Sequence, residues 1–317
     1  MQTWTDTFTM LLAPVLFFFA SSIKIVSGAD WCYQSEFTCS NACPGPDAWG
    51  RVSQHCRGRS QSPVNVVTKR VLPDGRLTPL QFIGYQDTFH GRLINTGHNV
   101  QLDLPQSIRI NGGNLAAPYR ALQLHLHWGK DGGPGSEHMI DGEQFPMEMH
   151  IVHIKDEYNS LSQAVRDRTG VAVLGFFFQV SESANKKFDP LINALKYITQ
   201  PTNSTTLRGV SLEMFIPPQK NLAKYFRYDG SLTTPNCAEA VVWSLFENTI
   251  PLGRKQLAAF SQLQFLNGKD MVNTYRPVQT LNGRQVYYSG SHVAVVSSVL
   301  LIISVLVSSA LSVYTTE

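Results

Sequence analysis

The sequence lacks any concentration of positive charge. Its 26 Lys and Arg residues against 23 Asp and Glu leave a formal net charge of +3, and no basic run or stripe occurs. Proteins that bind nucleic acids usually gather Lys and Arg on one face, so we expect no nucleic-acid partner. Internal repeats and low-complexity linkers are also absent. The motif His-Glu-x-x-His is missing as well, which argues against a zincin.

The N-terminal end differs from the rest of the chain. An apolar segment, Leu11–Ala20, is followed by Ser21–Ala29, which is rich in small residues. This pattern predicts a signal peptide over residues 1–29, because the apolar segment is too short to span a bilayer comfortably. Residues 30–289, about 260 in number, are then enough for one domain with a substantial core.

The C-terminal end allows two interpretations. His292–Thr316 contains no Lys, Arg, Asp or Glu, and its apolar stretch Val293–Tyr314 has 22 residues. That length suffices for a transmembrane helix, but only Thr315–Glu317 follows it, without a basic residue to fix its orientation. The other interpretation is a GPI-anchor signal, for which Ser289-Gly290-Ser291 supplies the small residues, although the usual polar spacer is nearly absent.

The most informative segment is Gln123–Trp128, with the sequence QLHLHW. In a β-strand alternate side chains share a face. Gln123, His125 and His127 therefore lie on one face, and the apolar residues between them lie on the other. A strand of this kind presents two imidazoles as metal ligands.

A second segment, MEMHIV, alternates in the same way and places Glu148, His150 and Val152 on one face. Two such strands side by side bring three histidines together. A catalytic zinc site has three protein ligands and leaves the fourth position for water. We predict one Zn²⁺ ion, bound by His125, His127 and His150.

Two polar residues lie beside the predicted ligands. Gln123 precedes His125 by two residues on the same face, and Glu148 precedes His150 in the same way. A ligating histidine usually donates its second ring N–H to an amide or carboxylate, which fixes its tautomer. We predict this role for both residues.

The remaining pattern indicates many short strands and few helices. Val171–Val180 is a continuous apolar run, typical of a strand that is buried on both faces. Surface helices are expected at Ser160–Arg166, Pro190–Tyr197 and Leu252–Leu266.

Cysteine usage fits an oxidising compartment. The chain has five cysteines, and all but the last lie near the N-terminus: Cys32, Cys39, Cys43, Cys56 and Cys237. Together with a signal peptide they are disulfide candidates. Asn203-Ser204-Thr205 is a sequon in a polar stretch, which predicts N-glycosylation of Asn203 on a surface loop.

Eight ordered motifs identify a family. They are Trp31-Cys32-Tyr33, Gln61-Ser62-Pro63-Val64-Asn65, Asn95-Thr96-Gly97-His98, Gln123-Leu124-His125-Leu126-His127-Trp128-Gly129, Gly135-Ser136-Glu137-His138, Met147-Glu148-Met149-His150-Ile151-Val152-His153, Gly230-Ser231-Leu232-Thr233-Thr234-Pro235 and Tyr275-Arg276-Pro277-Val278-Gln279. On these motifs the chain resembles the α-class carbonic anhydrases, and in particular their extracellular, membrane-anchored members. The resemblance runs from Trp31 to about Tyr288.

The resemblance implies a fold and an activity. The expected fold is mainly β, a single domain with a large, twisted, mostly antiparallel central sheet and peripheral short helices. The zinc would lie at the base of a conical cleft. The expected reaction is the reversible hydration of carbon dioxide to bicarbonate and a proton by attack of zinc-bound hydroxide, since zinc in this class is known to bring the pKa of its bound water to about 7.

The resemblance also assigns roles to further residues. Thr233 matches the threonine that accepts a hydrogen bond from the hydroxide and donates one to Glu137. His98 matches the proton shuttle, which suits a side chain with a pKa near 6.5; a solvated histidine beside a glycine turn is the alternative. The residues expected to hold the substrate are Val152, Val173, Leu232, Thr233, Thr234 and Trp243.

Disulfides, anchor and partners follow from the same resemblance. It pairs Cys56 with Cys237 and Cys32 with Cys43, while Cys32 with Cys39 stays open. It favours a GPI anchor attached at Ser289, with residues 290–317 removed on maturation. The expected location is the extracellular face of the plasma membrane, with bicarbonate or acid–base transporters as partners besides carbon dioxide and bicarbonate.

Two other function classes are alternatives to an active carbonic anhydrase. One is a catalytically inactive domain of the same family, used as a surface ligand or receptor module. Such domains typically lose a zinc histidine, whereas this chain keeps all three, together with Thr233 and Glu137. The other is a zinc hydrolase of a different kind, for which no motif is present.

Overall fold

A computed structural model describes residues 31–36 and 43–290 of the chain. The predicted signal peptide, Cys39 and the apolar stretch Val293–Tyr314 lie outside the described residues. Within the described part of the chain, no helix is long and apolar enough to cross a membrane.

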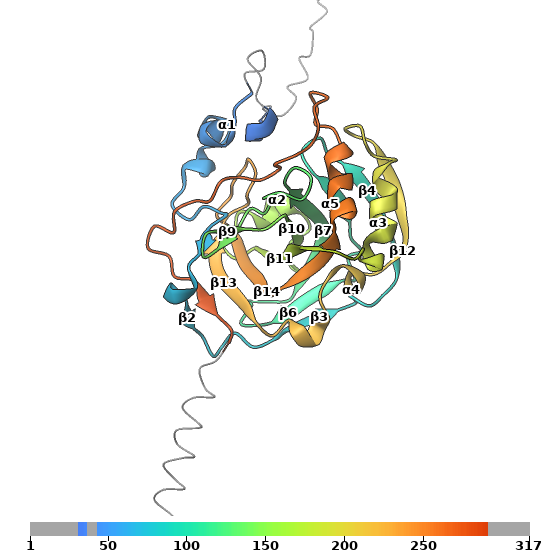
Figure 1. The fold of residues 1–317 in the computed structure, drawn as a ribbon. Coiled ribbons are helices and arrows are strands. Elements are labelled where there is room, and N and C mark those ends of the chain that lie inside the picture. Colours follow the sequence, from blue (N-terminus) through green and yellow to red (C-terminus); the bar gives the residue numbers. More distant parts are fainter. Residues whose placement is uncertain (1–30, 37–42, 291–317) are drawn as a thin grey trace, which may run out of the picture. The chain divides into compact units, whose positions relative to one another are not determined.

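The fold is mainly β, as predicted, and is built on one 12-stranded sheet (Figure 1). The strand order is β12-β4-β5-β7-β10-β11-β14-β13-β15-β2, with β6 pairing to both β7 and β3. Most pairs are antiparallel, but β11 runs parallel to β14 and β15 runs parallel to β2. A separate small sheet has the order β1-β8-β9.

The bounds of the strands are β1 Asn65–Val66, β2 Leu72–Pro73, β3 Leu80–Ile83, β4 Phe89–Asn95, β5 Val100–Asp103, β6 Arg109–Gly112, β7 Tyr119–Trp128, β8 Met139–Ile140, β9 Glu143–Gln144, β10 Met147–Lys155, β11 Val171–Ser181, β12 Ser204–Val210, β13 Tyr225–Gly230, β14 Val241–Gly253 and β15 Tyr287–Tyr288. Those of the α-helices are α1 Trp49–Val52, α2 Leu161–Ala164, α3 Asp189–Leu195, α4 Leu212–Phe215 and α5 Arg254–Ala259.

The predicted apolar run is a central strand. β11 lies between β10 and β14, and its first eight residues are buried. Its side chains alternate between two apolar clusters: Leu174 and Phe176 belong to the larger one, whereas Val173 and Phe177 belong to the smaller. Strand alternation therefore separates the two faces of the sheet, each with its own core.

The predicted helices exist but are shorter than expected. The pattern over Leu252–Leu266 predicted one helix, whereas β14 continues to Gly253, α5 covers Arg254–Ala259 and a 3₁₀ turn follows over Phe260–Gln262. The residues that produced the helical spacing, Leu257, Phe260 and Leu263, are buried in the larger core. Strand β14 extends into the range that was predicted to be helical. Packing against the core of the sheet limits the helix to fewer turns.

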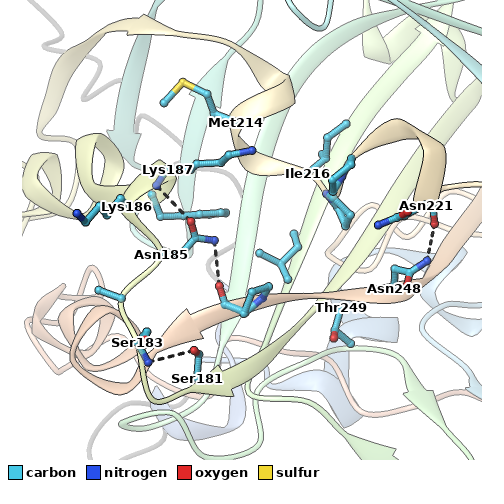
Figure 2. Close-up of a pocket in the computed structure, with 16 residues that line it drawn as sticks. Ser181, Ser183, Asn185, Lys186, Lys187, Met214, Ile216, Asn221, Asn248 and Thr249 are labelled. Carbon is cyan, nitrogen blue, oxygen red and sulfur yellow. Dashed lines mark hydrogen bonds between the residues drawn. The ribbon is translucent and has the colours of Figure 1, made fainter.

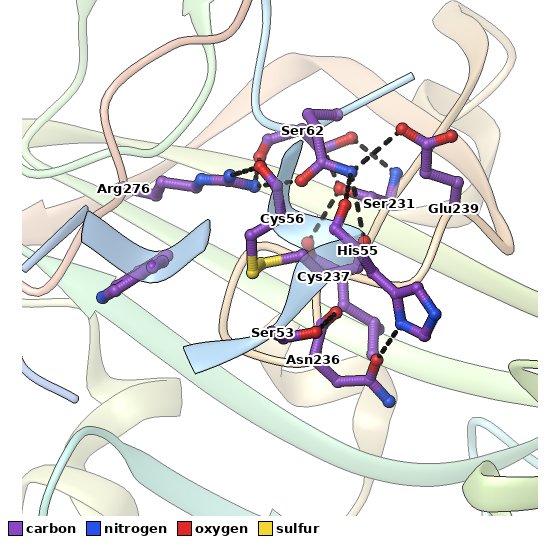
Figure 3. The surroundings of a disulfide bond; sticks show 12 residues. Ser53, His55, Cys56, Ser62, Ser231, Asn236, Cys237, Glu239 and Arg276 are labelled. Carbon is purple, nitrogen blue, oxygen red and sulfur yellow. Dashed lines mark hydrogen bonds between the residues drawn. A yellow bond between two sulfur atoms is a disulfide. The ribbon is translucent and has the colours of Figure 1, made fainter. Parts of the chain in front are cut away.

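Two disulfides fix the N-terminal segment. Cys32 pairs with Cys43, and Cys56 pairs with Cys237. The second bond joins residues 181 positions apart and lies directly beside Ser231 and the loop that follows β13 (Figure 3).

The second disulfide is expected to stabilise the fold more than the first. Loop-closure entropy predicts a loss of about 5 kcal/mol for a Cys56→Ser/Cys237→Ser variant and about 3 kcal/mol for Cys32→Ser/Cys43→Ser, because the loops differ in length. Denaturant unfolding of both variants measures the difference. Equal losses, or a free Cys237 thiol found by non-reducing peptide mapping, would contradict this expectation.

Candidate metal centre

The three predicted ligands lie on two neighbouring strands. In the antiparallel pair of β7 and β10, His125 is directly opposite His150, and His127 is opposite Glu148. The nitrogen atoms that the three histidines can offer to a metal lie within 4.8 Å of one another. The strand register alone brings the three rings to one point.

Outer hydrogen bonds determine which nitrogen of each ring faces the centre. Nδ1 of His125 lies 2.8 Å from Oε1 of Gln123, and Nε2 of His150 lies 2.6 Å from Oε1 of Glu148. Both oxygens accept, so the ring nitrogens carry the protons and donate. The opposite nitrogens, Nε2 of His125 and Nδ1 of His150, are then left with lone pairs.

The third histidine is held by the backbone. Nδ1 of His127 donates to the carbonyl oxygen of Thr274 over 2.6 Å. Its Nε2 is buried and has no hydrogen-bond partner among the described residues. Sequence reasoning did not find this contact, because any residue type supplies a carbonyl oxygen.

The inward-facing atoms suit a zinc ion. Nε2 of His125 and Nδ1 of His150 are 3.2 Å apart, and ligands bound tetrahedrally at about 2.05 Å lie about 3.3 Å apart. Three acceptor nitrogens that face one another in a buried site have no donor to satisfy them, and a cation provides what they lack.

Burial keeps the three imidazoles neutral, which is the form that binds metal. It lowers the pKa of His125 well below the usual value, with His127 and His150 acting in the same direction. It brings the pKa of His127 to about 3. The pKa of His150 is also lowered by burial, although Glu148 opposes the shift.

Thr233 and Glu137 adjoin the histidines. The hydroxyl of Thr233 hydrogen-bonds to the Glu137 carboxylate, and the backbone N–H of Arg276 donates to Glu137 Oε1 over 2.9 Å. Glu137 Oε2 lies 3.4 Å from His127 Nε2. Burial and the nearby Glu148 raise the pKa of Glu137, and the charge of a bound cation opposes this shift.

The loop that carries Thr233 is fastened at both ends. Ser231 and Ser62 exchange two hydrogen bonds, each from the backbone N–H of one to the hydroxyl of the other, over 2.9 and 3.0 Å. Trp243 donates its indole N–H to the carbonyl of Ser231 over 3.1 Å. At the other end the loop is joined to Cys56 through Cys237 (Figure 3).

The residues predicted to hold the substrate form an apolar row. Val152 is opposite Val173, and Val173 is opposite Trp243. All three are at most 3% exposed, and Leu232 packs against the same cluster. Thr234, the last predicted member, accepts a hydrogen bond from the backbone N–H of Cys237 over 2.8 Å through its carbonyl.

Glu148 has more partners than the sequence indicated. Its Oε2 accepts the backbone N–H groups of Glu137 and His138, and its Oε1 lies 2.7 Å from His138 Nδ1. His138 Nε2 in turn lies 2.6 Å from the hydroxyl of Tyr228. Burial acts to raise the pKa of Glu148, but the neighbouring His138 and His150 outweigh it and hold this pKa well below its usual range. No sequence spacing signals this network, because Tyr228 is 90 residues from His138.

Gly175 is a further residue that sequence reasoning missed. It lies on β11 opposite His150. A Cβ atom at this position would lie 2.6 Å from Leu245 Cδ2 and 3.4 Å from Glu148 Oε1. The absence of a side chain leaves room for the Glu148–His150 pair.

His98 lies at the turn between β4 and β5. Its ring stacks on Trp31, with 3.9 Å between centroids and an interplanar angle of 12°, and Tyr33 meets it edge-on. Its side chain is 20% exposed. Because Gln101 on β5 is opposite His125, this turn leads directly into the strand next to the ligand strand β7.

A cavity of about 600 Å³ lies elsewhere, between the β11–α3 connection and the end of β14 (Figure 2). Lys186, Met214, Ile216 and Asn248 are among its lining residues, and none of the candidate site residues lines it. It takes no part in the metal centre.

Comparison with known proteins decides the family. A family model described as eukaryotic-type carbonic anhydrase matches residues 44–290. The chain belongs to this family. Carbonic anhydrase 4 of Rattus norvegicus is 40% identical over 266 residues, covering 82% of this chain and 84% of the relative. Carbonic anhydrase 15 of Mus musculus is 34% identical over 276 residues, covering 83% and 84%. Carbonic anhydrase 12 of Homo sapiens is 34% identical over 313 residues, covering 96% and 85%.

Family membership confirms the predicted family and makes the chain a carbonic anhydrase, an enzyme of a zinc-dependent class. The matched residues include the three histidines, Glu137 and Thr233. The cluster of His125, His127 and His150 can hold the metal ion.

Loss of one ligand is expected to abolish zinc binding. His150→Ala leaves two imidazoles, whereas Gln123→Ala keeps all three and should weaken zinc affinity on the order of 10–100-fold. His153→Asn is the matched control, because His153 also lies on β10 but contacts Tyr85. Zinc content per folded chain after dialysis measures the effect, and full occupancy in His150→Ala would refute the ligand set.

Proposed function

We propose that this carbonic anhydrase hydrates carbon dioxide reversibly at the extracellular membrane surface, with zinc held by His125, His127 and His150 and a proton relay through His98. The observation that carries the metal site is the inward orientation of three neutral imidazole nitrogens whose outer N–H groups are all bonded. When bound, zinc in this class supplies hydroxide near neutral pH from a coordinated water.

Thr233 orients the nucleophile. Its hydroxyl proton is engaged by Glu137, so its oxygen is free to accept a hydrogen bond. An acceptor at this position would take the O–H of the hydroxide and leave an oxygen lone pair directed toward the substrate. Arg276 keeps Glu137 in place through its backbone N–H, while its guanidinium binds Gln61 and the carbonyl of Ser62 (Figure 3).

The apolar row binds the carbon dioxide. The substrate is small and carries no net charge, so a wall of Val152, Val173, Leu232 and Trp243 accepts it without charged partners. Bicarbonate is charged and better hydrated, so the same wall disfavours the product. Thr234 follows Thr233 on the same loop and is the remaining residue of the proposed substrate site.

Regeneration of the nucleophile requires proton export to solvent. A partly exposed histidine suits this step, because it accepts and releases a proton near neutral pH. His98 combines a 20% exposed side chain with a position just before β5, the strand that pairs with β7.

The location rests on the ends of the chain and on its covalent features. Two disulfides are typical of an oxidising compartment. Asn203 is exposed, in the turn directly before the edge strand β12, where a glycan has room. We propose residues 1–29 as a signal peptide, and 290–317 as a GPI signal that leaves the anchor on Ser289. Bicarbonate transporters in the same membrane are the proposed partners.

Ser289 is well placed to end the folded domain. It follows β15, and its hydroxyl accepts from the backbone N–H of Tyr225 over 2.9 Å and donates to the carbonyl of Ala223 over 2.8 Å. The domain is therefore held together up to the proposed attachment residue.

His98→Ala is expected to separate the two steps of the reaction. Stopped-flow hydration of carbon dioxide should slow in dilute buffer, while the exchange between carbon dioxide and bicarbonate at chemical equilibrium stays nearly unchanged. Added imidazole buffer should restore the rate. An inactive wild-type protein would exclude the proposed hydration of carbon dioxide. An identical buffer dependence of wild type and His98→Ala would exclude His98 as the shuttle.

Phosphatidylinositol-specific phospholipase C is expected to release the enzyme from intact cells. A GPI anchor is the substrate of this lipase, whereas a transmembrane helix is not. Activity in the supernatant is the measurement, with a trypsin-treated sample as a positive control for release. If activity stays on the cells and Val293–Tyr314 is recovered in the mature protein, the anchor is a helix.

A further inference from the structure

A buried carboxylate lies beside the proposed proton shuttle. Glu36 ends the 3₁₀ turn Gln34–Glu36 and is only 3% exposed. Its Oε1 accepts the backbone N–H of Tyr33 over 2.8 Å and lies 3.9 Å from Nδ1 of His98. Glu36 lies before residues 44–290, the range that matches the family model, so the family match assigns no role to it.

The surroundings hold His98 in this place. The ring stacks on Trp31, and the turn before it requires a glycine, because Gly97 has φ +88° and a Cβ there would lie 2.6 Å from Leu266 Cγ. The side-chain oxygen of Asn95 accepts the backbone N–H of Gly97 over 2.8 Å. The imidazole and the carboxylate therefore belong to two fixed segments.

We propose that Glu36 is a positioning residue for the proton relay: its buried carboxylate faces the imidazole of His98, stabilises the imidazolium that forms when His98 takes up a proton, and keeps the ring against Trp31. This inference rests on the proposed shuttle role of His98. It adds a charged partner to that role, and Glu36 itself does not touch the substrate or the metal.

The charges around Glu36 are consistent with such a pair. Burial raises its pKa to about 7, although the Tyr33 N–H and the charge of Lys269 act in the opposite direction. Among the described residues, the titratable groups that face it include His98, Lys269 and the phenol of Tyr33. Lys269 contacts Glu36 at its backbone carbonyl, over 3.4 Å.

The sign of the coupling follows from these groups. Above about pH 7 Glu36 is ionised, and its negative charge raises the proton affinity of His98. Below that pH Glu36 takes up a proton, and its influence on His98 fades. A proton shuttle is most effective when its pKa is close to that of the zinc-bound water from which it takes the proton. For this class that pKa is about 7.

Glu36→Gln tests the proposal. Glutamine retains an oxygen that can accept the Tyr33 N–H, so the turn is expected to fold, while the charge is lost. By NMR titration, the pKa of His98 should fall by about 0.8 or more, because a charge about 4 Å away has an effect of this size even in bulk water and Glu36 is buried. Hydration in dilute buffer should slow about 2- to 5-fold, with its pH profile shifted, while exchange at chemical equilibrium stays unchanged.

Further variants separate the possible failures. Glu36→Asp should restore part of both effects because it keeps the charge, and the exposed Glu182→Gln should change neither. In a His98→Ala background, Glu36→Gln should add nothing. If His98→Ala itself leaves turnover in dilute buffer unchanged, the shuttle assignment fails. If His98→Ala slows turnover but Glu36→Gln alters neither the His98 pKa nor the rate, Glu36 has no positioning role.

Discussion

The register between β7 and β10 is the constraint on which the rest of the site depends. It sets His125 opposite His150 and His127 opposite Glu148. A shift of one residue in either strand would turn its histidines to the other face of the sheet, into the larger apolar core. Buried apolar side chains on both faces oppose such a shift, since Met149 and Ile151 pack on one side and Val152 and Ile154 on the other. A well-determined sheet therefore brings the three histidines together.

A second constraint is the attachment of the Thr233 loop to distant parts of the chain. Ser62 binds Ser231, Cys56 is bonded to Cys237, and the backbone of Arg276 holds Glu137. The guanidinium of Arg276 also reaches the Gln61 side chain and the Ser62 carbonyl. Segments separated by more than 130 positions in the sequence therefore fix one hydroxyl group relative to three imidazoles. A site with this rigidity needs little rearrangement to react.

Alternation in two strands was enough to predict that His125, His127 and His150 come together and that Gln123 and Glu148 hydrogen-bond to His125 and His150, because strand geometry converts sequence spacing directly into direction. The sequence could not reveal contacts that use the backbone or that cross long distances. Thr274 holds His127 through its backbone carbonyl, and Gly175 makes room for the Glu148–His150 pair because it has no side chain. His138 bonds to Tyr228, which is far away in the sequence. Helix lengths were overestimated, because the spacing of Leu257 and Phe260 also fits a short helix followed by a 3₁₀ turn.

Anomalous diffraction at the zinc absorption edge, on crystals of the zinc-loaded protein, tests the central claim most directly. The account predicts one strong peak per chain, about 2.0–2.1 Å from Nε2 of His125, Nε2 of His127 and Nδ1 of His150. A peak at another place, or one bound through the opposite ring nitrogens, would contradict it.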